Sequence, residues 1–188
     1  MKLVIGLGNP GRQYEGTRHN AGFWWVDRLA RQTGVTLRTE PRFHGQLAKL
    51  AASGHECWLL KPDTFMNESG RAARSLAQFY KLPPAEILVA HDELDLPPGA
   101  VKLKQGGGVA GHNGLKDIAA HLGHDFWRLR IGIGHPGDRA QVVNYVLASP
   151  RQEEAELIGA AIDRSLEVWP LLVRGETEAA MHRMHTRP

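Results

Sequence analysis

Polar side chains that could do chemistry gather in short segments rich in glycine and proline, each of which follows an apolar run. An amide beside a glycine is by itself more typical of a turn. Three such segments at one sheet edge favour a binding role, because an amide offers a donor and an acceptor without charge and can bind a peptide bond or polarise a carbonyl. The candidates by type and place are Asn9, His19, Asn67, Asp92 and Asn113.

His19 is the strongest candidate for a general base. It lies in the glycine-bounded segment GTRHNAG (16–22), at an expected helix start. A neutral imidazole has an ordinary pKa of about 6.5, and a carboxylate on its other nitrogen fixes tautomer and orientation. Asp92, at the end of a predicted strand, is the preferred partner, and Asp95 is the alternative. A water activated by this base, with amides stabilising the oxyanion, suits attack on an ester.

The segment GLGNPG (6–11) has the spacing of a dinucleotide-binding glycine motif, but its context argues against that function. The motif needs a helix that opens at the second and third glycines and faces a pyrophosphate. Here Pro10 and Gly11 are followed by a further helix breaker, Gly16, and Asp27 falls inside the next helix, where no ribose could meet it. We therefore interpret GNPG as a tight turn that holds Asn9.

Other catalytic plans have less support. The sequence contains no G-x-S-x-G elbow, no C-x-x-C, no H-E-x-x-H and no G-K-[ST] phosphate loop. A metal site built from His91, Asp92, Asp95 and His112 is an alternative, but its spacing matches no ligand signature. We therefore expect neither a metal nor a cofactor.

Strand-like and helix-like segments alternate along the chain. This order predicts an α/β sandwich of three layers, with a twisted, mixed and mostly parallel sheet between helices. In such sheets the ligand binds outside the carboxyl ends of the strands, where the polar segments follow. Strands are expected at 2–7, 44–52, 57–62, 86–92, 100–105 and 126–134, and helices at 20–33, 68–80, 112–122, 139–147, 151–173 and 176–185.

Size and composition fit one domain over residues 1–188. The apolar runs are far shorter than the roughly 20 residues of a membrane span, and the start MKLVIGL lacks the features of a signal peptide. A single cysteine, Cys57 in a strand-like run, fits a reducing compartment. We therefore expect a cytoplasmic protein without membrane contact.

Six segments together resemble the bacterial peptidyl-tRNA hydrolase family. They cover nearly all of residues 2–147 in order and at consistent spacing: GLGNPG, YEGTRHNAG, TFMNESG, ILVAHDELDLPPG, the glycine loop ending in GHNGLKDI, and RLRIGIGHP. The resemblance implies a monomeric α/β sandwich that needs no metal and cleaves the ester between a peptide and its tRNA. It implies that His19 activates water and that Asp92 keeps it able to accept a proton.

The resemblance also implies how the substrate is bound. Asn9 would read the blocked amino end by accepting from its N–H group, and Asn67 and Asn113 would bind the peptide backbone and the attacked region. Tyr14 and Phe65 would contact the acylated 3′ end of the tRNA, and Met66 would line the same groove. One departure is the pair Val109 and Ala110 in the glycine loop, where a β-branched Val109 should stiffen the backbone.

A formal net charge of +3 and a pI of about 9.2 do not by themselves indicate a partner. By resemblance, a basic patch holds tRNA phosphate, and a spread patch fits contact with the backbone rather than with bases. A non-catalytic RNA-binding relative is the alternative, but it could have lost His19 or Asp92, and both are present. The expected patch consists of Lys102, Lys104, Lys116, Arg128 and Arg130.

Overall fold

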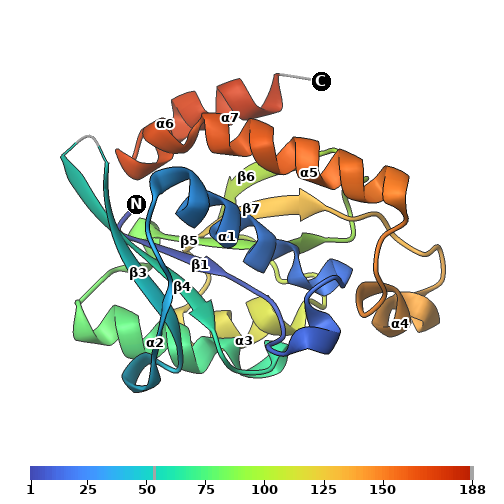
Figure 1. Cartoon of the computed structure of the whole chain (residues 1–188), viewed down its shortest axis with the longest axis horizontal. Helices are drawn as coiled ribbons and strands as arrows, with labels where there is room; N and C mark the ends of the chain where they lie inside the picture. The colour runs from blue at the N-terminus through green and yellow to red at the C-terminus, as the bar shows by residue number, and fades with distance from the viewer. Residues whose placement is uncertain (53, 187–188) are drawn as a thin grey trace.

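A twisted sheet with a parallel centre forms the middle of the molecule. This computed structural model describes residues 1–52 and 54–186, and within them seven strands pair in the order β2-β3-β4-β1-β5-β7-β6 (Figure 1). β1 pairs in parallel with β4 and β5, and β5 with β7, whereas β2, β3 and β6 run antiparallel to their neighbours. The expected mixed sheet is confirmed. The strands are β1 (Leu3–Gly6), β2 (Arg38–Glu40), β3 (Gly45–Ala52), β4 (His55–Pro62), β5 (Ile87–Glu93), β6 (Val101–Gln105) and β7 (Trp127–Gly132).

Helices cover both faces of the sheet and complete three layers. Helices α1, α5, α6 and α7 pack on one face, and α2 and α3 on the other (Figure 1). No helix in the described residues is long and apolar enough to cross a membrane. The helices are α1 (Ala21–Thr33), α2 (Ser69–Phe79), α3 (Asn113–Leu122), α4 (Val142–Val146), α5 (Gln152–Glu167), α6 (Trp169–Val173) and α7 (Thr177–His185).

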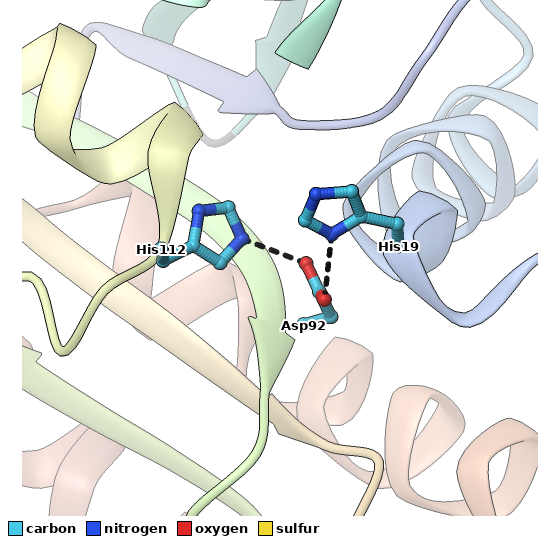
Figure 2. Close-up of side chains that lie close together, drawn as sticks. All are labelled: His19, Asp92 and His112. Atoms are coloured by element: carbon cyan, nitrogen blue, oxygen red, sulfur yellow. Dashed lines mark hydrogen bonds and ion pairs between the residues drawn. The ribbon is translucent and has the colours of Figure 1, made fainter. Parts of the chain in front are cut away.

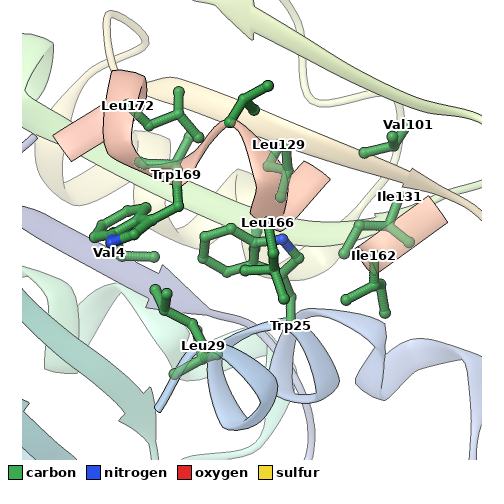
Figure 3. Close-up of a cluster of buried hydrophobic side chains, with 14 of the residues drawn as sticks. Val4, Trp25, Leu29, Val101, Leu129, Ile131, Ile162, Leu166, Trp169 and Leu172 are labelled. Carbon is green, nitrogen blue, oxygen red and sulfur yellow. The ribbon is translucent and has the colours of Figure 1, made fainter. Parts of the chain in front are cut away.

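Alternation along each strand supplies two apolar cores. In β1, Leu3 and Ile5 pack with α2 and α3, whereas Val4 packs with α1 and the C-terminal helices, because successive strand residues point to opposite faces. Trp25 of α1 lies edge-on to Trp169 (Figure 3). Its indole N–H also donates to the hydroxyl of Ser165 at 2.8 Å. This contact attaches α1 to the C-terminal helices.

Two helices predicted as continuous are divided. The expected helix 139–147 begins as a 3₁₀ turn (Arg139–Gln141) before α4, and the expected helix 151–173 is divided into α5 and α6 at Val168. Pro170 lies two residues further on and cannot donate a backbone hydrogen bond to the preceding turn. The exposed three-residue strand β2 was not predicted, since so short a segment has little hydrophobic pattern.

Gly22 lets α1 approach the sheet closely. A Cβ atom there would lie 2.3 Å from the carbonyl oxygen of Ala90 and 2.5 Å from the backbone nitrogen of Leu7. The turn that carries His19 (Arg18–Asn20) immediately precedes α1. Close packing of the α1 start against β1 and β5 therefore brings His19 to the carboxyl end of β5.

We expect Gly22→Ala to lower the free energy of unfolding by about 3 kcal/mol, because backbone atoms of two strands would have to move. Gly159→Ala is the matched control, since the nearest atom to its Cβ is a guanidinium nitrogen of Arg28 at 3.8 Å. This second change should raise stability by up to about 1 kcal/mol through helix propensity. Urea unfolding measures both, and equal midpoints for the two variants would contradict the packing argument.

Candidate active site

A cleft with a volume of about 270 Å³ opens at the carboxyl ends of β1 and β5. It brings together seven predicted residues, namely Asn9, His19, Phe65, Met66, Asn67, Asp92 and Asn113. Tyr14 lies beside it, with its ring edge-on to Phe65 at a centroid distance of 6.5 Å. The basic residues Lys102, Lys104 and Arg130 are not among its lining residues.

The cleft contains a carboxylate shared by two imidazoles. Oδ2 of Asp92 lies 2.8 Å from Nδ1 of His19, and Oδ1 lies 2.8 Å from Nε2 of His112 (Figure 2). Asp92 is 3% exposed. The alternative carboxylate, Asp95, is exposed in the loop beyond β5.

Hydrogen bonds fix where the protons lie. Nδ1 of His112 accepts from the backbone N–H groups of Gly114 and Leu115, so His112 caps the start of α3. Its proton is therefore on Nε2, which donates to Asp92. His19 donates from Nδ1 to the other carboxylate oxygen, and this tautomer leaves a lone pair on Nε2. Such an imidazole can accept a proton from a water molecule.

The electrostatics of the pair suit a base. Burial by itself lowers the pKa of His19, but the charge of Asp92 and its hydrogen bond outweigh burial and raise this pKa above its ordinary value. Burial by itself would raise the pKa of Asp92, but the two imidazoles hold this pKa far below the usual range. Asp92 is therefore ionised, and His19 accepts a proton more readily than a free imidazole.

His112 is the member of this cluster that the sequence analysis did not place in the site. It was considered there as a metal ligand. The available signal was a histidine at the first position of the predicted helix 112–122, where a side chain can accept from the first N–H groups. Its second contact, with Asp92 from 20 residues away, depends on the fold.

The donor set at this cluster is poor for a metal. His19, Asp92 and His112 offer ligand atoms within 4.8 Å of one another. A metal ligand must present a lone pair, yet the α3 cap puts a proton on Nε2 of His112. Binding a metal there would break the cap or the pair.

The amide of Asn9 is held in one orientation. Its Oδ1 accepts from the N–H of Met66 at 2.7 Å, while its backbone N–H and carbonyl bond to the side chain of Asn20. Because Oδ1 is already engaged, the amide hydrogens on Nδ2 are the group that Asn9 offers a ligand. This polarity differs from the expectation that Asn9 accepts from an N–H of the substrate.

Exposed residues form the outer part of the cleft. Asn67 and Asn113 are exposed, Phe65 is 57% exposed, and Met66 is buried. An apolar wall missed in the sequence comes from α4 and the residue after it, where Val143 is 66% and Leu147 40% exposed. The cleft thus combines amide groups with apolar surface.

The predicted basic patch needs one correction. Lys102 lies opposite Arg130, and Lys104 opposite Arg128, across the β6–β7 pair. Arg128, however, is buried, and its guanidinium donates to the carbonyl oxygens of Gly106, Gly108 and His124. Because the glycine loop folds back over β7, Arg128 stabilises the loop through these hydrogen bonds. We therefore define the basic face as Lys102, Lys104 and Arg130, with Lys116 exposed on α3.

The glycine loop that precedes His112 contains a non-glycine residue in the left-handed region. Ala110 has φ +47°, and the carbonyl of Val109 accepts from the N–H of His112 at 2.8 Å. Val109 is half-buried against the core beneath α2 and α3. The loop is thus attached at both its Arg128 and its His112 ends.

These features define an α/β enzyme with a histidine–carboxylate–histidine cluster in a cleft at the carboxyl ends of parallel strands. Comparison with known families makes the assignment specific. A family model described as peptidyl-tRNA hydrolase matches residues 3–188. The chain therefore belongs to the peptidyl-tRNA hydrolase family and is a hydrolase.

Individual relatives match over almost their whole length. A peptidyl-tRNA hydrolase of Nitrosospira multiformis is 62% identical over 188 residues, which cover 100% of this chain and 98% of the relative. One from Cupriavidus pinatubonensis is 60% identical over 195 residues, covering 99% and 98%. The crystal structure of peptidyl-tRNA hydrolase from Acinetobacter baumannii has a TM-score of 0.97 at 48% identity, covering 99% of this chain and 95% of that chain.

The shared carboxylate predicts how His19 titrates. We expect its imidazole resonances to titrate above pH 6.5 and to move to lower pH in Asp92→Asn, because the charge that raises its pKa is lost while burial remains. Asp95→Asn is the control and should leave the titration unchanged. NMR measures this, with the signal assigned by its loss in His19→Gln. A higher midpoint in Asp92→Asn would contradict the assigned pair.

Proposed function

We propose that this protein hydrolyses the ester between a peptide, or an N-blocked aminoacyl group, and tRNA, and thereby recycles tRNA from stalled or released peptidyl-tRNA. Membership of the family supports the reaction class. One observation carries the mechanism: His19 donates from Nδ1 to a buried carboxylate, so that Nε2 is left as a base in the cleft.

In the proposed reaction, Nε2 of His19 takes a proton from a water molecule whose oxygen attacks the ester carbonyl carbon. The bond to the ribose oxygen then breaks, and that oxygen takes the proton from the imidazolium, which releases a free peptide acid and tRNA. Asp92 stabilises the transient imidazolium, and His112 keeps Asp92 in place. The exposed amides of Asn67 and Asn113 donate to the oxyanion and bind the peptide backbone.

The remaining cleft residues bind the two ends of the scissile ester. The Nδ2 hydrogens of Asn9 donate to a carbonyl oxygen next to the ester, a group that every N-blocked aminoacyl end carries. Tyr14 and Phe65 contact the acylated 3′ end of the tRNA, where aromatic side chains can stack on bases. Met66 lines the groove between these contacts.

The basic face binds phosphates of the tRNA, so the enzyme accepts tRNAs without reading their bases. One domain over residues 1–188, a monomeric state, activity without a metal and a cytoplasmic location remain predictions from the sequence.

We expect His19→Ala to abolish cleavage of N-acetylaminoacyl-tRNA while its binding to tRNA stays within about threefold, because a general base acts on the barrier more than on ground-state affinity. Asp92→Asn should be impaired less, since the imidazole survives. Release of free tRNA measures both, with and without a chelator. Activity of His19→Ala close to wild type would overturn the mechanism, loss on chelation would favour a metal enzyme, and inactive wild-type protein would favour a binding module.

Removal of two charges from the basic face tests the phosphate contacts. For Lys104→Ala with Arg130→Ala, the slope of log affinity against log salt should fall by about 0.7 to 0.9 per lost contact on whole tRNA. A short acylated 3′ fragment should show little change. Arg38→Ala with Lys49→Ala is the charge-matched control at the opposite end of the sheet. Equal losses on both substrates would mean that the two residues support the fold instead.

A further inference from the structure

A second carboxylate stands next to Asp92 at the end of β5. Oε1 of Glu93 accepts from Nε of Arg130 at 2.8 Å, and the two side chains are 12% and 23% exposed. Glu93 also lines the catalytic cleft. One ion pair therefore connects the cleft to the basic face.

Strand alternation separates the tasks of the two carboxylates. Asp92 points toward the α1 side and meets His19, whereas Glu93 and Arg130 lie toward the face of the sheet that carries Lys102. Both carboxylates are attached to the same rigid strand end. The imidazole and the guanidinium are thus held at a fixed separation.

The contact with Glu93 leaves one side of the guanidinium available. Glu93 engages Nε, and the two terminal nitrogens make no other hydrogen bond within the described residues. A guanidinium is planar, so holding Nε fixes the direction of its remaining N–H groups. That arrangement suits a phosphate, which two parallel N–H donors can bind together.

We propose that Glu93 is a positioning residue that orients Arg130 toward one phosphate of the tRNA and so sets the distance between this phosphate and the ester at His19. The inference rests on the proposed function. It assigns Glu93 a part in selecting substrates whose phosphate and ester are correctly spaced, over short esters that lack the phosphate.

The negative charge of Glu93 allows its role in orienting Arg130 to be distinguished from its direct electrostatic effect on the phosphate. A carboxylate beside a phosphate site weakens attraction of the phosphate, so loss of the charge alone should strengthen binding. If orientation dominates, Glu93→Ala instead weakens use of whole tRNA, because Arg130 is no longer held. Glu93→Gln removes the charge but keeps an oxygen that accepts from Nε.

The test compares kcat and KM on whole N-acetylaminoacyl-tRNA and on a short acylated 3′ fragment. For Glu93→Ala we expect KM for whole tRNA to rise about tenfold, and the loss in kcat/KM to be about fivefold greater than on the fragment. Glu93→Gln should recover most of this loss. Glu93→Ala added to Arg130→Ala should cost less than about twofold further, because Glu93 acts through Arg130. Asp95→Asn is the matched control, since it removes an exposed carboxylate two residues away, in the loop that follows β5.

Three results would overturn the proposal. These are equal losses of kcat/KM on both substrates, a lower KM of Glu93→Ala for whole tRNA, or additive losses of kcat/KM in the double variant. If Glu93→Ala does not fold, Arg130→Lys decides, because lysine keeps the charge without a planar fork. Wild-type kinetics in Arg130→Lys would also exclude orientation. Hydrolysis of both substrates by the wild-type protein tests the proposed function separately, so that the two failures can be distinguished.

Discussion

The site depends on one buried ionised carboxylate. Removing a carboxylate from water is costly unless donors replace the lost solvation. Asp92 receives two N–H donors, one from the turn before α1 and one from the residue before α3. These segments belong to opposite layers of the sandwich. The requirement to satisfy one charge therefore determines how both layers must meet at the end of β5.

The sequence predicted the elements well, because helix and strand periods are local properties. Strands and helices were expected within a few residues of their positions, and the cleft contains Asn9, His19 and Asp92 as the loop argument required. The breaks near α4 and at Val168 were missed, since a hydrophobic period continues across a bend.

Residues whose roles come from tertiary contacts could not be predicted. Arg128 and Arg130 lie two positions apart on β7 and therefore point to the same face of the sheet. Yet Arg128 is buried beneath the glycine loop, whereas Arg130 contacts Glu93. No local pattern separates them. The second contact of His112 has the same character, because it joins residues that are distant in the sequence.

The capping bond of His112 also limits which residues could ever replace it. One ring nitrogen accepts from the backbone of α3 and the other donates to the carboxylate of Asp92. A substitute must therefore accept from its own helix start and, from the far end of the same side chain, donate to Asp92. Asparagine is a good cap but shorter than imidazole, and glutamine is longer but an uncommon cap. Histidine is also limited to one tautomer, because Nδ1 must keep a lone pair to accept from two N–H groups of α3. Local order at the start of that helix and the hydrogen bonding of the cluster therefore depend on a single imidazole ring.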